Sequence, residues 1–206
     1  MKQAMLSRAI LVAVSYVAAQ IFADIGSLRI LFLAGQSVDG GTLIYPFTFT
    51  LRDMLHKAAG VATTRLVIFL AALINLFMAL YFTLIAELPA DMAVGSQEEF
   101  GSVLGPVWRI VFASIIAELI AELLDTEVYR LWVARMGDRW QWGRVLSSNA
   151  LAIPLDSALF VLIAFLGDLP LPVLFSIFIA NVVIKGAVTL ISIPGIYLIK
   201  EESALS

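Results

Sequence analysis

Acidic side chains recur at helical spacing inside an apolar stretch in the middle of this sequence. Glu118 and Glu122 are one helical turn apart, Ser114 precedes them by one turn and Asp125 follows, so all four share one helix face. Carboxylates accept hydrogen bonds and neutralise cations. This face therefore favours a ligand that is cationic or rich in hydrogen-bond donors. Alanines at positions 113, 117 and 121 form an adjacent stripe of small residues that allows close helix packing.

Three other apolar stretches carry polar residues one or two helical turns apart. Each group lies on a single helix face, which predicts that several helices direct polar atoms into a shared interior. A bundle builds a ligand site in this way. The groups are Tyr16, Gln20 and Asp24; Asn149 and Asp156, with Phe160 one turn later; and Asn181, Lys185 and Thr189.

The buried charges have a structural interpretation as well as a functional one. Arg52 with Asp53, or Lys185 with Asp156, would neutralise each other and fix the register of two helices. Gln20, Asn75 and Asn181 are, taken singly, more typical of helix packing than of ligand binding. Acids nevertheless outnumber bases in these stretches, and pairing alone does not explain the excess. A binding site and structural ion pairs both stay open for these residues.

The composition explains why such charges need a reason. Of 206 residues, 61% are apolar and 14% are charged, with a mean hydropathy of +0.98. Soluble domains have about 45–50% apolar and about 25% charged residues. A chain this short cannot bury so much apolar surface in one core. The surrounding solvent must be lipid, where a charged residue near the bilayer centre costs roughly 2.5–3.5 kcal/mol.

Six apolar runs are candidates for membrane-spanning helices, because a bilayer core requires about 20 residues per helix. Asn75 is the one strongly polar residue in the third run. We expect an all-α fold, a polytopic six-helix transmembrane bundle that forms a single integral membrane domain over residues 1–206. Residues 26–34 either extend the first span or form a re-entrant piece. The predicted spans are 9–34, 43–57, 66–86, 106–129, 145–166 and 171–199.

Basic residues predict the orientation, since Lys and Arg on short loops stay cytoplasmic. With both termini in the cytoplasm, the outer side receives Arg29 and an acidic loop at 88–105. We therefore expect a multi-pass protein of the bacterial inner membrane with cytoplasmic N- and C-termini. The basic residues assigned to the cytoplasmic side are Lys2, Arg8, Lys57, Arg65, Arg130, Arg135, Arg139, Arg144 and Lys200.

Several functions are excluded by what the sequence lacks. There is no cysteine and only one histidine, His56, so disulfides, thiol catalysis and zinc sites built on Cys or several His are excluded. The sequence has no G-x-x-x-x-G-K-[ST] phosphate-binding loop, so the chain does not hydrolyse ATP by itself. It also has no G-x-S-x-G or H-E-x-x-H motif, which are typical of serine hydrolases and metalloproteases. The net charge of -3 argues against nucleic-acid binding. We expect no enzyme activity, no cofactor and no metal.

Five segments in order along the chain resemble the queuosine precursor transporter family, formerly called vitamin uptake transporters. The run GTLIYPFTFTLRD from Gly41 to Asp53, with Gly60 seven residues later, is similar to the family signature. The later segments are the run from Arg109 to Ala117 with Asp125 and Val128-Tyr129, Arg144 with Ser147-Ser148, the run from Leu155 to Phe160 with Ala164-Phe165, and Lys185 with Pro194 and Tyr197.

This resemblance implies import of the 7-deazaguanines preQ0 and preQ1, and a fold similar to the substrate-binding subunits of energy-coupling-factor transporters. A guanine-like edge carries N–H donors that Glu118, Glu122 or Asp156 would accept, and an aromatic face suits a flat base. The predicted substrate-binding residues are Glu118, Glu122, Asp156, Lys185, Asn149, Asp53, Gln20, Tyr45, Phe49 and Phe160.

Two alternatives to this function stay open. One is a subunit that binds another vitamin-like molecule and works with a separate ATPase. The other is a membrane scaffold whose buried charges only pair helices. The expected partners are a small-molecule substrate, a 7-deazapurine, and the lipid bilayer, without nucleic acid; a homo-oligomer and an ATPase partner are not decided by the sequence.

Overall fold

The structure is a computed structural model that describes residues 2–136 and 141–198. The described chain forms two compact units. Unit 1 contains the residues up to Ile30 together with Asp39–Val111, and unit 2 contains Leu31–Val38 and Phe112–Leu198. The chain therefore leaves unit 1, contributes a short segment to unit 2, and returns. Single-domain organisation over residues 1–206 stays a prediction.

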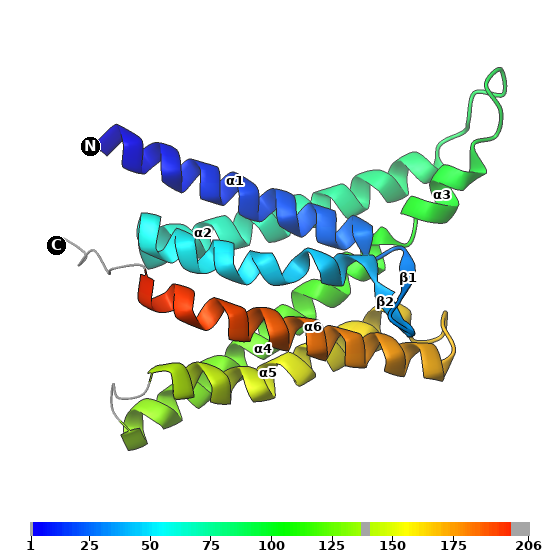
Figure 1. Cartoon of the computed structure of the whole chain (residues 1–206). Helices are drawn as coiled ribbons and strands as arrows, with labels where there is room; N and C mark the ends of the chain where they lie inside the picture. The colour runs from blue at the N-terminus through cyan, green and yellow to red at the C-terminus, as the bar shows by residue number, and fades with distance from the viewer. Residues whose placement is uncertain (1, 137–140, 199–206) are drawn as a thin grey trace. The chain divides into compact units, whose positions relative to one another are not determined.

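The regular structure is almost entirely helical, as the apolar runs predict (Figure 1). Within the described residues, five helical segments are long and apolar enough to cross a membrane: 7–26, 62–87, 98–121, 146–165 and 171–191. This confirms an all-α, multi-pass membrane protein. Similarity to energy-coupling-factor subunits stays a prediction. The helices are α1 (Lys2–Gly26), α2 (Tyr45–Glu87), α3 (Glu98–Leu104), α4 (Val107–Met136), α5 (Gln141–Phe165) and α6 (Leu171–Leu198).

Large apolar side chains lie exposed on the helices, whereas several charged and amide side chains are buried. Phe22 on α1, Phe77 on α2 and Phe175 on α6 are 60%, 68% and 65% exposed. Asp156 and Lys185 are only 5% and 4% exposed. Lipid solvates the first group and rejects the second, so this distribution is the one a bilayer imposes.

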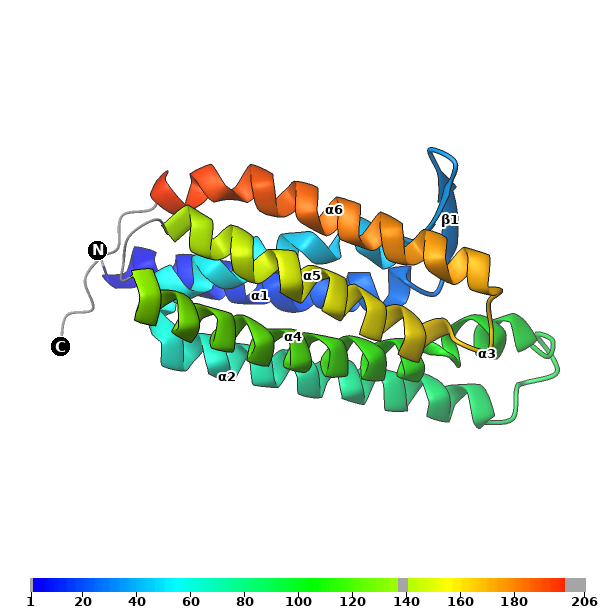
Figure 2. The ribbon, with the colours of Figure 1, turned by 90° about the horizontal axis from the view of Figure 1, so that it is seen from below.

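Helix α2 contains two of the predicted spans, joined at a chain reversal. Gly60 has φ 79° and ψ 168°, a conformation that residues with a Cβ rarely adopt. The limbs on either side, residues 45–59 and 61–87, run in opposite directions (Figures 1 and 2). The first limb is shorter than the roughly 20 residues that cross a bilayer core. A sixth span, predicted at 43–57, stays a prediction.

The segment after α1 differs from the prediction. The first helix ends at Gly26, and residues 30–39 form a β-hairpin of β1 (Ile30–Leu33) and β2 (Gln36–Asp39). Neither a helical span to residue 34 nor a re-entrant helix is present. Ala34 and Gly35 both have positive φ, 51° and 80°, as a tight two-residue hairpin turn requires. Apolar residues alone did not reveal that the chain turns back here.

The hairpin is fixed to α6 by polar contacts within unit 2. The backbone N–H of Ser37 donates to Ser176 Oγ at 2.7 Å, and Ser176 Oγ donates to Gln36 Oε1 at 2.8 Å. One serine hydroxyl thus binds both the backbone and a side chain of β2. The two contacts determine where the hairpin lies on the first turns of α6.

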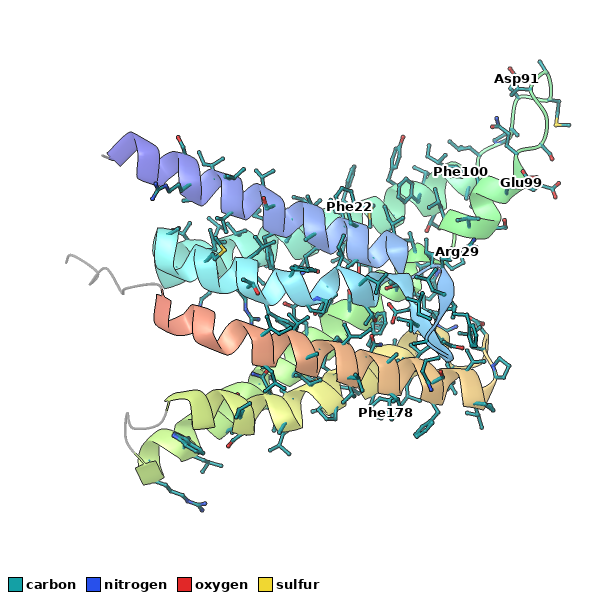
Figure 3. All side chains as sticks on the ribbon, viewed as in Figure 1. Phe22, Arg29, Asp91, Glu99, Phe100 and Phe178 are labelled. Atoms are coloured by element: carbon teal, nitrogen blue, oxygen red, sulfur yellow. The ribbon has the colours of Figure 1, made fainter. Side chains whose placement is uncertain are left out.

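Unit 1 is organised around the packing of α1 against α2 and a 3-10 turn, η1 (Gly40–Leu43). A Cβ at Gly41 would collide with Ser27 Oγ and with the backbone oxygen of Ala23, so only glycine allows this approach. At the other end of α2, Phe82 packs edge-on against Phe100 of α3, with ring centroids 6.2 Å apart. Phe100 and the acidic residue Glu99 lie on α3, and Asp91 lies in the loop before it (Figure 3).

Unit 2 contains most of α4 and the packed pair α5 and α6. On α4 the predicted small-residue stripe is buried, with Ala113 0% and Ala117 1% exposed. Pro154 lies inside α5, two residues before Asp156. The predicted orientation in the membrane is not tested by the fold, and two of its basic residues, Arg139 and Lys200, lie outside the described residues.

Candidate functional site

A buried ion pair joins α5 to α6. Lys185 Nζ lies 2.5 Å from Asp156 Oδ2 and donates a hydrogen bond to it. Both side chains are almost completely removed from solvent. Because an uncompensated charge inside a membrane protein is costly, each residue makes the burial of the other tolerable. The predicted pairing of these two residues is therefore present in the structure.

Further polar groups lie on the helix faces that carry this pair. Asn181, one turn before Lys185, is 1% exposed, and Asn149 on α5 is half-buried. Ser157, next to Asp156, is fully buried, and no described residue hydrogen-bonds its Oγ. The interior of unit 2 thus combines an acid, a base, two amides and a hydroxyl. Such a set can bind a ligand with several N–H and C=O groups.

Phe160, predicted to stack on the substrate, already has an aromatic partner. It is 8% exposed, and its ring meets that of Phe165 edge-on, with centroids 5.8 Å apart and an interplanar angle of 89°. This geometry is favourable for two aromatic rings. It leaves the role of Phe160 in substrate binding a prediction.

The predicted acidic face of α4 is only partly described. Glu118 is half-buried in unit 2. Glu122 and Asp125 belong to α4 by their backbone, but their side chains lie outside the described residues. Cooperation between Glu118 and Glu122 stays a prediction.

In unit 1, all three residues of the polar face predicted on α1 are buried. Tyr16, Gln20 and Asp24 are 1%, 5% and 2% exposed. Gln20 Nε2 donates to the Tyr16 hydroxyl oxygen at 3.0 Å, which fixes the amide one turn along the helix. The spacing of four residues thus identified a real interior face. Asp24, the last of the three, is a buried acid that the list of predicted binding residues omits.

A second polar group of unit 1 is structural. Asp39 is 1% exposed and caps η1, accepting at Oδ1 from the Ser27 hydroxyl (2.8 Å) and the Thr42 N–H (3.0 Å). The Thr42 hydroxyl donates to its second oxygen, Oδ2, at 2.5 Å. This carboxylate joins the end of α1 to the start of α2 and has its oxygens occupied. The sequence signal was available, since Asp is one of the residues preferred at a helix N-cap.

The aromatic residues at the start of α2 lie together. Tyr45 is 9% exposed and meets Phe49 edge-on, with centroids 5.4 Å apart, and the Arg52 guanidinium lies 5.5 Å from the centre of the Phe49 ring. Arg52 therefore has an aromatic partner. The side chain of Asp53 lies outside the described residues, so its predicted pairing with Arg52 stays a prediction.

The predicted binding residues divide between the units. The ion pair of Asp156 with Lys185 and the ring pair of Tyr45 with Phe49 are brought into direct contact. The sequence did not identify buried polar atoms that lack a hydrogen-bond partner among the described residues, such as Ser157 Oγ. Residue spacing shows which helix face a side chain lies on, but not which atoms it contacts. Among the described residues, no group of three or more His, Asp or Glu could hold a metal ion. Unit 1 holds Gln20, Tyr45, Phe49 and Asp53, and unit 2 holds Glu118, Glu122, Asn149, Asp156, Phe160 and Lys185.

Comparison with known proteins covers most of the chain. Residues 39–199 match a family model described as "Putative vitamin uptake transporter". Over 187 residues the chain is 30% identical to a Bacillus subtilis (strain 168) protein named "Probable queuosine precursor transporter", covering 89% of this chain and 80% of that protein. No solved structure matches the chain. The family match includes both partners of the buried ion pair.

Proposed function

The chain belongs to the vitamin uptake transporter family, and from this we propose that it imports queuosine precursors, the 7-deazaguanines preQ0 and preQ1. The substrate class rests on one observation, the 30% identity to the protein named as a queuosine precursor transporter over nearly the whole length of this chain. We place it in the bacterial inner membrane with both termini in the cytoplasm, on the distribution of its basic residues. It moves its substrate unchanged and is not an enzyme.

The buried polar groups supply chemistry that suits these ligands. A 7-deazaguanine presents N–H donors on one edge, and Asp156 is a buried carboxylate that can accept such donors. PreQ1 also carries an aminomethyl cation. In our proposal this cation replaces Lys185 Nζ as the partner of Asp156, so that the carboxylate is never left without a positive neighbour. Gln20 and the Tyr45–Phe49 ring pair offer an amide and aromatic surfaces in unit 1.

Uptake by a bacterial strain that neither makes nor imports queuosine precursors tests the substrate. Expression of this chain should restore queuosine in tRNA when preQ0 or preQ1 is supplied at nanomolar concentration. Asp156→Asn keeps the shape of the side chain and removes its charge, and it should abolish the restoration. Asp168→Asn, at an exposed acid beyond α5, serves as the matched control and should behave as wild type. If inserted wild-type protein restores no queuosine, the substrate assignment is wrong.

A second candidate is favoured by the description of the matching family, which refers to vitamin uptake. In that case the chain binds another vitamin-sized molecule and depends on a separate ATPase. Purified protein in liposomes separates the two. Uptake of radiolabelled preQ1 by the chain alone supports our proposal, and copurification with ATPase subunits without such uptake supports the second candidate.

A further inference from the structure

Asn75 is an isolated polar residue in the membrane-spanning limb of α2. It is 4% exposed, and its Oδ1 has no hydrogen-bond donor among the described residues. One turn to either side on the same face, Ala71 and Ala79 are 2% and 3% exposed. The interior face of this limb is therefore lined by methyl groups on both sides of one amide.

The other polar side chains of the interior face show how this helix normally satisfies its hydrogen bonds. Thr64 is completely buried, and its hydroxyl donates to the Gly60 backbone oxygen at 2.9 Å. Thr83 is half-buried and donates to the Ala79 backbone oxygen at 2.9 Å. Both use the backbone oxygen four residues earlier. Asn75 does not, and a buried carbonyl without a donor costs about 1–3 kcal/mol.

We propose that Asn75 is a substrate-contacting residue whose Oδ1 accepts an N–H group of the transported base. This inference rests on the proposed function and extends it to a residue that spacing alone assigns to helix packing. A packing amide would be paired with a neighbouring group. An acceptor held without a donor, between two alanines, is instead satisfied when a ligand supplies the donor. The neutral amide suits the uncharged donor edge that preQ0 and preQ1 share, because it adds no second charge to the membrane interior.

The stability of Asn75→Leu tests, without a ligand, whether Asn75 packs helices together. Leucine has the same number and branching of side-chain heavy atoms as asparagine, although it is bulkier, and it removes a polar group that has no donor among the described residues. We expect the melting temperature of the purified protein in detergent to be unchanged or higher. Thr83→Val, which removes a hydroxyl already engaged within its own helix, is the matched control. A large fall for Asn75→Leu and for Asn75→Ala, with Thr83→Val unchanged, would show that Asn75 packs helices together and overturns the inference.

Uptake kinetics in liposomes test whether Asn75 contacts the substrate. With radiolabelled preQ0, Asn75→Leu should raise KM about 5- to 100-fold, as expected for loss of one buried hydrogen bond, with little change in the maximal rate. Two competitors locate the donor, one lacking the exocyclic amine and one methylated at N1. Wild type should discriminate against both, and Asn75→Leu should lose its discrimination against one of them.

The outcomes separate this inference from the proposed function. Wild-type uptake together with unchanged KM and unchanged discrimination in Asn75→Leu overturns the role of Asn75 and leaves the transport proposal intact. Absence of preQ0 and preQ1 uptake by inserted wild type overturns the transport proposal and the ligand named here. In that case the melting temperatures still decide whether Asn75 is a packing residue.

Discussion

Removing the charges of Asp156 and Lys185 singly and together should separate structural pairing from substrate binding. Asp156→Leu removes the carboxylate to which the buried Lys185 donates, and Lys185→Met removes the cation beside the buried Asp156. Each single substitution should lower the free energy of unfolding by about 3–5 kcal/mol. That corresponds to a hundred- to several-thousand-fold shift in the unfolding equilibrium, with about 1.4 kcal/mol per factor of ten. For a chain of this size, about 2–4 °C are lost per kcal/mol, so the melting temperature should fall by roughly 6–20 °C.

The double substitution should behave differently from either single one. Replacing a buried ion pair by apolar groups of similar volume is often neutral or stabilising. We therefore expect Asp156→Leu with Lys185→Met to regain most of the lost melting temperature. If the pair also serves the substrate, the double variant should stay inactive in preQ1 uptake although it is stable. Its preQ0 uptake should suffer less, since preQ0 lacks the aminomethyl cation.

The measurements are thermal unfolding in detergent, followed by the fluorescence of the four tryptophans, and uptake of both radiolabelled precursors in liposomes. A stable double variant with wild-type uptake of both precursors would refute a binding role and leave only a structural pair. A double variant less stable than both single variants would refute the energetic reasoning itself.

Three further predictions concern the backbone. Gly41→Ala should lower the melting temperature by several degrees or prevent folding, because its Cβ has no room; Gly186→Ala, whose Cβ meets nothing within 4 Å on α6, should be neutral or slightly stabilising. Gly60→Ala has room for a Cβ, yet should cost about 1–3 kcal/mol of unfolding free energy, because φ 79° with ψ 168° is a conformation essentially restricted to glycine; an unchanged melting temperature would contradict this. Ser176→Ala removes the hydroxyl that accepts from the Ser37 backbone N–H and donates to Gln36, and should cost about 1–3 kcal/mol of unfolding free energy; an unchanged melting temperature would show that these contacts do not stabilise the position of β2 on α6.

Much of the helical structure followed from the sequence, because a bilayer requires long apolar runs and charges mark their ends. The hairpin did not follow. Residues 30–33 are the apolar tetrapeptide ILFL, which fits the end of a span as well as a strand. The decisive features are Gly35 in the turn and the glycine pair at 40–41, which approach other backbone closely. Their effect depends on tertiary packing, which local pattern does not show.

The candidate site was predictable to the extent that it depends on helical faces. Spacing of four residues correctly grouped Tyr16, Gln20 and Asp24 as a buried face, and opposite charges suggested the contact between Asp156 and Lys185. Which polar atoms lack a partner was not predictable, because that depends on the relative register of different helices. Asn75 illustrates this, since its type and position alone favour packing.

The buried charges are more informative about function than about stability. Two apolar residues would fill the space of Asp156 and Lys185 and would spare the chain the desolvation of two ions, which ion pairing at best offsets. Helices α5 and α6 already pack through apolar residues such as Leu174 and Ile177, which are 4% and 0% exposed. Apolar contacts therefore hold these helices together alongside the ion pair. We therefore propose that this pair, placed where lipid excludes water and where apolar residues could stand, serves the transported ligand.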